Sequence, residues 1–577
     1  MQHNGPEPQH SPRYPKLSVA LSMAALAYLI ALILSFKGQW FNPHSTGGDA
    51  TQQLFPFYQA IAPDIFKDDI IFESMKSYLA PLHWWIGYGT TLLTHDPVMT
   101  GHWIMLYQFL TVSLFLFLTV QYLASTPAAL LALIWFMHQE QLIGNIATGL
   151  PRGWIGAILI AFLYFLVQKK HAQIWIVLFV GSLLNAVGTF VAAICYGSFM
   201  VLGITKAESR PNFKKPFILA CILAPLLLVT TMMALSRPNG IGKMVTLAEA
   251  SKMEAFQRKG GRFPFLPFLS VQQEFQKNAF RSFVSKKAKM PRNFRLILIG
   301  GVVLLLAVFA IIGRVTRREI LQREVLLLIG SATAAYLLAR VLAFNLYVPA
   351  RYLNWPFGMA WTVLFPVALW RSHEALRRNK FGKLLVSVIA ISALAIVLAG
   401  TGFRVGKRGA LATLDLSRKP APPYAWIKAA APRTAVLASH PVYINALPLA
   451  GMRRAYITEE TAHPFYDQYW AEAQKRISVS LKAFYAEDLS DLKSAVAKER
   501  IDYFIFPRSY FELGSDGSGL SHRSIFKPFL TLSRELTART PEAYLGWRLL
   551  NQSQGQDPDF IVYRDSECVV VDLNRLN

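Results

Sequence analysis

Apolar runs of about 20 residues recur along the first 400 positions of this 577-residue chain. An α-helix of about that length crosses the hydrocarbon core of a bilayer, which is about 30 Å thick. The composition agrees, because 53% of the residues are hydrophobic and 16% are charged, whereas soluble proteins carry about 25% charged residues. The sequence therefore predicts an α-helical polytopic membrane protein.

Eleven membrane spans are expected between residues 17 and 403. They are 17–36, 102–121, 128–143, 154–168, two short helices within 172–204, 216–235, 294–313, 325–345, 355–370 and 383–403. The stretch 172–204 is divided because a single helix of its length would reach about 50 Å. Gly181, Asn185 and Gly188 predict a turn inside it.

The distribution of basic residues predicts how these spans are oriented. Residues 1–16 are polar and are expected to form a disordered cytoplasmic tail, because Arg13 and Lys16 directly precede the first span. Eleven spans then place the C-terminus outside. The short loops predicted to be cytoplasmic are all basic: 169–171, 206–215, 314–323 and 371–383. The net charge of +25 is therefore attributed to topology, and nucleic acid is not an expected partner.

Two outer loops and a C-terminal domain follow from this orientation. The loops cover 37–101 and 236–293, and the second, rich in Phe, Lys and Arg, is expected to lie on the outer membrane surface. Residues 404–577 are less apolar and predict a soluble, extracytoplasmic α/β domain. Its strands are expected at 434–438, 501–506, 560–563 and 568–572, and its helices at 466–476 and 489–500. Three cysteines suggest no disulfide framework.

The ionisable residues of the membrane part gather at its outer side. The first outer loop contains GGDATQQLFPFYQAIAPDIFKDD (47–69), which has Asp49 at its start and the pair Asp68 and Asp69 at its end. Glu140, Arg152, Arg340 and Arg351 fall near the outer ends of spans. An ion-coupled transporter places such residues near the midplane and often shows inverted repeats. Neither feature is visible, so the pattern favours an enzyme that works at the outer face.

Each of these residues also has a simpler interpretation. Asp49 could cap a helix that starts at Thr51. Asp68 and Asp69 could form a solvated turn, and Glu140 could neutralise Arg340. Arg152 and Arg351, each shortly after a proline, fit either interfacial anchors or a bidentate clamp for phosphate. Four polar residues of the C-terminal domain lack metal-ligand spacing and are expected at the surface: His440, Glu459, Glu460 and His463.

The chain resembles the GT-C glycosyltransferases, polytopic enzymes that use lipid-linked sugar donors. The resemblance lies in the acidic first outer loop (GGDATQQ…FKDD), the Pro151-Arg152 pair, the Arg351-Tyr352 pair and the C-terminal outer domain. Uncharacterised bacterial members of that superfamily are the most similar. The resemblance implies a multi-pass protein of the bacterial cytoplasmic (inner) membrane, with its C-terminal domain in the periplasm. The absence of a WWD signature argues against protein N-glycosylation.

The resemblance also implies roles for single residues. Asp49 would act as the catalytic base, with Asp69 and Asp68 as weaker candidates, and any divalent metal (Mg or Mn) would sit at Asp49. The expected phosphate-binding residues are Arg152, Arg351, Arg340 and Tyr352, and the further site candidates are Gln52, Gln53 and Glu140. The donor would be a polyprenyl-phosphate-linked hexose or pentose and the acceptor a glycan or lipid, with inversion at the anomeric carbon.

A second interpretation is a lipid-linked saccharide transporter or a non-catalytic membrane assembly protein. It differs from the enzyme in a testable way, because an enzyme needs the Asp49 carboxylate and a scaffold does not.

Overall fold

The computed structural model describes most of the chain. The described residues are 41–205, 210–235, 240–279, 322–346, 348–376, 414–417, 421–513, 520, 525–552 and 557–576, with scattered positions between 22 and 33. The predicted tail 1–16 and the predicted spans 294–313 and 383–403 lie outside these residues, as does most of the span 17–36.

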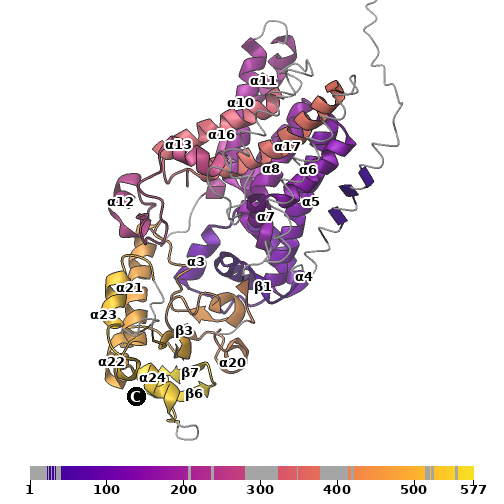
Figure 1. Ribbon diagram of the computed structural model, residues 1–577. Helices are drawn as coiled ribbons and strands as arrows, with labels where there is room; N and C mark the ends of the chain where they lie inside the picture. Colours follow the sequence, from indigo (N-terminus) through magenta and orange to yellow (C-terminus); the bar gives the residue numbers. More distant parts are fainter. Residues whose placement is uncertain are drawn as a thin grey trace, which may run out of the picture.

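Long helices form one end of the molecule, and a mixed sheet lies at the other end (Figure 1). The helices are α4 (Pro81–Thr94), α5 (Pro97–Leu123), α6 (Thr126–His138), α8 (Trp154–Val167), α9 (His171–Leu184), α10 (Ala186–Thr205), α11 (Arg210–Leu235), α16 (Arg323–Val341) and α17 (Arg351–Leu376). Helix α5 packs against α6 and α8, and α16 packs against α10 and α17. Helices α8, α10 and α16 share an apolar core that is buried around Phe162, Tyr196 and Tyr336.

Four described helices are long and apolar enough to cross a membrane by length and composition: α5, α10, α16 and the part of α11 from Lys215 to Met232. Helices α6, α8 and α9 are apolar but shorter, with 13 or 14 residues, which corresponds to about 20 Å. The chain is therefore mostly helical with membrane-spanning character, and the number of eleven spans stays a prediction.

The break inside 172–204 is confirmed at one residue. Helix α9 ends at Leu184 and α10 begins at Ala186. Asn185 adopts an extended backbone conformation, and its Oδ1 accepts hydrogen bonds from the backbone N–H groups of Val187 and Gly188. These bonds cap α10, because the first N–H groups of a helix have no partner within it.

The predicted span 128–143 is wrong in its second half. Helix α6 ends at His138, Gln139 leaves the helical region with a ψ of 87°, and a new short helix, α7 (Glu140–Ile146), follows. The break coincides with the polar run from His138 to Gln141, and polar and ionisable residues are costly inside a membrane span.

The C-terminal part contains a five-stranded mixed sheet with the order β4-β3-β5-β7-β6. The strands are β3 (Val436–Ala438), β4 (Arg454–Ala455), β5 (Tyr503–Pro507), β6 (Ile561–Arg564) and β7 (Cys568–Asp572). Strand β3 runs parallel to β4 and β5, whereas β7 is antiparallel to β5 and β6. Four of these strands overlap the predicted ones. The helices around the sheet are α20 (Tyr424–Ala430), α21 (Asp467–Phe484), α22 (Leu489–Val496), α23 (Leu530–Leu536) and α24 (Leu545–Asn551).

The first outer loop connects the two ends of the molecule. It contains β1 (Ser45–Thr46), α2 (Ala50–Gln53), η1 (Phe55–Ala60) and α3 (Ile70–Ser77). Strand β1 pairs with β2 (Leu414–Asp415). The Tyr58 hydroxyl donates to the carbonyl of Leu449 over 2.8 Å, and the Arg454 guanidinium donates to the carbonyl of Ile65 over 2.6 Å. The C-terminal part is thus fixed directly on the loop that carries the candidate carboxylates.

The described part of the second outer loop, 240–279, contacts the C-terminal part, and its expected position on the membrane surface stays a prediction. It contains α12 (Leu247–Lys252), η4 (Glu254–Phe256), α13 (Val271–Glu274) and η5 (Phe275–Ala279). Val245 N donates to Phe465 O over 3.0 Å, and Asp467 N donates to Lys243 O over 3.0 Å. These backbone bonds join the loop to the C-terminal part, and some of its aromatic residues pack at the same place. One example is Phe256, which stacks on Phe344 and meets Phe465 edge-on.

Candidate functional site

Asp49 lies at the start of α2, in a turn that needs glycine. A Cβ on Gly47 would lie 2.9 Å from Thr148 Cγ2, so the close approach of these two segments requires a residue without a side chain. Asp49 occupies the N-cap position of α2, but its side chain makes no capping hydrogen bond. The capping interpretation of this carboxylate is therefore wrong, and its side chain turns to a partner elsewhere.

That partner is Arg152, which lies in the short turn η3 (Pro151–Gly153). Two amide side chains from other parts of the chain fix this turn. Gln108 of α5 donates to Leu150 O over 2.9 Å, and Asn185 donates to Pro151 O over 3.2 Å. The turn residue between α9 and α10 thus also holds the backbone that presents Arg152.

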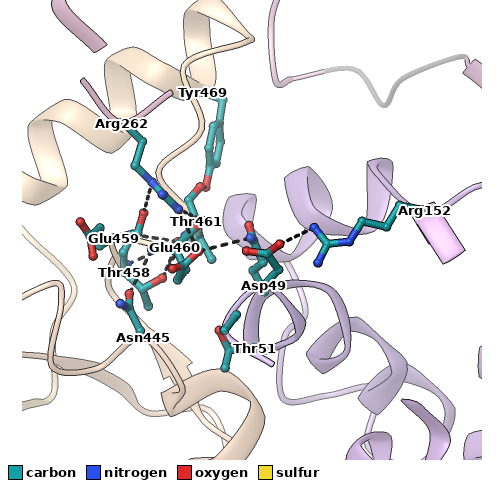
Figure 2. Close-up of polar contacts among 12 residues, drawn as sticks. Asp49, Thr51, Arg152, Arg262, Asn445, Thr458, Glu459, Glu460, Thr461 and Tyr469 are labelled. Carbon is teal, nitrogen blue, oxygen red and sulfur yellow. Dashed lines mark hydrogen bonds and ion pairs between the residues drawn. The ribbon is translucent and has the colours of Figure 1, made fainter. Parts of the chain in front are cut away.

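Arg152 and Asp49 form an ion pair in which Nη1 lies 2.5 Å from Oδ2 (Figure 2). Their side chains are 27% and 47% exposed, so the pair is accessible from solvent. Burial raises the pKa of Asp49, but the charge and hydrogen bond of Arg152, with smaller contributions from Arg351 and Arg262, hold that pKa below its ordinary value. Asp49 is therefore an ionised carboxylate within the field of three arginines.

Arg351 reaches this region from the first residue of α17. Its guanidinium lies over the Trp355 ring, 5.5 Å from the centroid, which restricts its direction. The neighbouring Tyr352 is buried and donates from its hydroxyl to Leu346 O over 2.9 Å. The Tyr352 phenol thus points into the protein. Of Arg351 and Tyr352, it is Arg351 whose charge acts on Asp49.

Arg340 makes structural contacts in the described part of the chain. It donates to the carbonyl of Leu269 over 2.7 Å and to the Tyr336 hydroxyl over 2.8 Å, and it lies over the Phe268 ring. Arg340 therefore ties the second outer loop to α16. Both hydrogen bonds come from Nη1, and a role of Arg340 in phosphate binding stays a prediction.

Asp68 and Asp69 lie in the turn before α3. Asp68 is exposed, with a φ of 60°. Asp69 is buried, and its carboxylate accepts from Ile71 N over 2.9 Å as the N-cap of α3. Burial raises the pKa of Asp69, and its nearest cations are Arg476 and Arg454 of the C-terminal part. The structure does not bring these two carboxylates together with Asp49.

The remaining candidates lie beside Asp49 or on α7. Gln52 is buried and donates from Nε2 to Glu460 Oε2 over 3.4 Å, and Gln53 is half-buried next to it. Glu140 is the first residue of α7, and its side chain lies outside what the structure describes.

Arg262 and Glu460 are neighbours of the site that the sequence interpretation missed. Arg262 comes from the second outer loop, and its Nη2 lies 2.9 Å from Glu460 Oε2. It also donates to the backbone carbonyls of Glu459 and Glu460. Figure 2 shows Glu460 and Arg262 on one side of Asp49 and Arg152 on the other. The signal available in the sequence was weak, because Arg262 is one of twelve Lys and Arg residues in this loop and no local motif distinguishes it.

The expected surface position of the C-terminal histidines is wrong. His440 and His463 are buried. His463 lies against the rings of Tyr78 and Phe263, and burial together with the nearby Arg262 lowers its pKa to about 3. It is a neutral side chain that fills space between the first loop and the C-terminal part.

The donor set around Asp49 does not fit a divalent metal. Among the described residues, no group of three or more His, Cys, Asp or Glu could hold an ion. The charged neighbours that act on Asp49 are arginines, which repel a cation and attract an anion. The site is suited to binding an anionic group.

No family model matches the chain, and no curated protein sequence matches it either. Among solved structures, the chain is similar to the Archaeoglobus fulgidus oligosaccharyltransferase in its apo form, with 13% identity, 87% of this chain and 71% of that chain covered, and a TM-score of 0.48. The complex of that enzyme with Zn and sulfate matches with 13% identity, 84% and 68% coverage and a TM-score of 0.42. Its complex with an inhibitory peptide and a dolichol-phosphate matches with 12% identity, 85% and 69% coverage and a TM-score of 0.41. Likenesses at this level establish neither a shared fold nor a shared activity.

Proposed function

We propose that this protein is a membrane glycosyltransferase that moves a sugar from a polyprenyl-phosphate-linked donor to a hydroxyl of a glycan or lipid acceptor. One observation carries the proposal. The accessible Asp49 carboxylate lies against Arg152, within the field of Arg351 and Arg262. An anionic base among three guanidinium groups, beside apolar helices, suits a reaction in which a lipid phosphate leaves and an alcohol attacks.

The reaction is a displacement at the anomeric carbon. The acceptor oxygen forms a bond to this carbon while the bond from the carbon to the phosphate oxygen breaks, and the electron pair stays on the leaving phosphate. The acceptor proton passes to the Asp49 carboxylate. A single displacement inverts the anomeric centre. Arg152 and Arg351 stabilise the negative charge that develops on the phosphate, because guanidinium groups match phosphate oxygens in pairs.

Because of this ion pair, binding of the donor would also activate Asp49 as a base. Arg152 contacts Asp49 through Nη1, so an incoming phosphate and the carboxylate compete for the same cation. Of the contacts that lower the pKa of Asp49, the one with Arg152 is the strongest. Asp49 loses this contact when the phosphate binds Arg152. Its basicity then rises while the donor is in place. A metal takes no part in this scheme.

The setting proposed for this reaction is the outer face of the bacterial cytoplasmic membrane. The basic short loops support this orientation, with the C-terminal part in the periplasm. The close contacts between the first outer loop and the C-terminal part support the same side for both.

The test is transfer of label from a radioactive polyprenyl-phosphate-sugar pool to endogenous acceptors in membranes that contain the protein. Wild-type protein is expected to support transfer, and Asp49→Asn at equal membrane abundance is expected to abolish it. Equal transfer by both proteins contradicts an enzymatic role for Asp49 and favours the transporter or assembly protein.

A further inference from the structure

Among the described residues, three half-buried amide side chains on helices next to the arginines each leave one polar atom without a hydrogen-bond partner. They are Gln141 and Asn145 on α7 and Asn354 on α17. In each, one polar atom is fully buried without a partner: Gln141 Oε1, Asn145 Nδ2 and Asn354 Oδ1. Buried polar atoms in proteins are nearly always paired, so each exception points to a bound water or ligand that completes it.

The placement of these amides is specific. Gln141 and Asn145 are four residues apart, so they lie on one face of α7. Helix α7 packs against η3, which carries Arg152, and against α17. Asn354 follows Arg351 by three residues on α17, so these two side chains share a face. The amides therefore flank the two arginines that would hold the donor phosphate.

An uncharged amide offers a donor and an acceptor in one group, and a sugar hydroxyl does the same. Amides that lie beside arginines are therefore suited to a sugar that is linked to a phosphate. The amides can bind the sugar hydroxyl groups, and the arginines can bind the phosphate. Burying one unpaired polar atom in each of three amides costs free energy unless such a partner binds there. An apolar chain would satisfy none of these atoms. A second phosphate, which offers only acceptors, would satisfy Asn145 Nδ2 and leave both amide oxygens unpaired.

We propose that Gln141, Asn145 and Asn354 form the subsite that binds the hydroxyl groups of the sugar on the polyprenyl-phosphate donor. The inference rests on the proposed function and goes beyond it, because it assigns sugar binding to residues separate from the base and from the phosphate-binding arginines.

The test compares lipids with and without a sugar. Purified protein in nanodiscs binds C55 polyprenyl phosphate and the same lipid carrying glucose, mannose, galactose or arabinose, and affinity is measured by microscale thermophoresis. The variants are Gln141→Met, Asn145→Leu and Asn354→Leu, which keep the approximate volume and remove the hydrogen-bonding groups. Gln168→Met serves as the control, because Gln168 is a half-buried amide at the far end of α8.

The expected result is selective. At least one sugar-bearing lipid binds wild-type protein more tightly than the bare lipid phosphate, and each variant loses about tenfold of that affinity, the order expected for one to two hydrogen bonds. Binding of bare lipid phosphate stays unchanged. The variants melt at the same or a higher temperature, because unpaired polar atoms have been removed. The Gln168 variant behaves as wild type.

Two results overturn the subsite and remain distinct from failure of the proposed function. If no sugar improves binding over bare lipid phosphate, or if the variants bind every lipid as wild type does, the amides hold water only. If wild-type protein does not bind bare lipid phosphate at all, the phosphate site and the proposed function fail, and the subsite fails with them.

Discussion

Asp49 and Arg152 are 103 residues apart in the chain, and their side chains meet at 2.5 Å. The contact joins the first outer loop to the turn before α8. Two glycine-dependent features make it possible: the close approach of Gly47 to Thr148, and the tight turn at Gly149, where φ is 70° and a Cβ would lie 2.2 Å from Gly101 O. The pair is therefore a product of backbone packing, and the accessible carboxylate remains available to a substrate.

The first prediction distinguishes Asp49 from Asp69. Asp49→Asn keeps size and removes basicity, so transfer is expected to fall by about 10²- to 10⁴-fold. Asp69→Asn is the matched control, since asparagine can still cap α3, and its transfer rate per folded molecule is expected to equal that of wild type. The measurement is the labelled transfer assay normalised to membrane abundance. Loss of transfer in both variants would contradict the assignment of Asp69 to a structural cap.

The second prediction concerns Arg152 and Arg351, the arginines proposed to bind the donor phosphate. Arg152→Lys and Arg351→Lys are each expected to weaken binding of C55 polyprenyl phosphate, and the alanine variants more so, because lysine lacks the planar fork. Arg371→Lys is the control, since Arg371 at the far end of α17 donates to Leu123 O and lies away from Asp49. Equal affinity in all variants would identify Arg152 and Arg351 as interfacial anchors.

The third prediction follows from the lowered pKa of Asp49. A carboxyl group whose folded-state pKa lies below its ordinary value near 3.8 stabilises the fold at pH values above that ordinary value, and this contribution disappears as the pH falls through the folded-state pKa. The thermal midpoint of wild type is therefore expected to exceed that of Asp49→Asn at neutral pH, by a modest margin because the pair is partly exposed. The difference should close below pH 3.8. If the difference in thermal midpoint grew on acidification, the pKa of Asp49 would be raised and not lowered.

The fourth prediction concerns Arg262 and Glu460. Arg262→Met removes the ion pair and two hydrogen bonds to backbone carbonyls, so stability is expected to fall by about 1–3 kcal/mol. The loop 240–279 should then be cleaved faster by trypsin at Lys259. Lys277→Met is the control variant, because it removes one positive charge from the same loop. Unaltered cleavage in Arg262→Met would show that other contacts, such as Val245 N to Phe465 O, hold the loop.

The fifth prediction tests the orientation in the membrane. Single cysteines at Ser372 and Ser515 in a cysteine-free background are labelled with an impermeant reagent in intact cells. The site at 372 is expected to be protected and the site at 515 to react, as the basic loops predict. The native cysteines must be removed first, because Cys221 is exposed. The opposite labelling pattern would place the Asp49 loop on the cytoplasmic side.

The sequence by itself determined the local elements. The apolar runs indicated helices at α5, α8, α10 and α16, and the glycines around Asn185 indicated the break between α9 and α10. Short apolar runs indicated β5 and β7. These signals are local, since helix length, turn chemistry and short apolar runs are each set by residues close together in the chain. The sequence also drew attention to the loop that begins at Gly47, because carboxylates beside an apolar span are unusual.

Only the tertiary structure decided which of these residues act together. Asp49 turned from a possible cap into the partner of Arg152, while Asp69 caps α3 instead. Arg340 bonds a loop carbonyl, and Arg262, absent from the sequence interpretation, lies beside Glu460. A carboxylate or guanidinium pairs with whatever group the packing of distant segments brings within about 3 Å. No local pattern encodes that choice, because it depends on how the first loop, the second outer loop and the C-terminal sheet pack on one another.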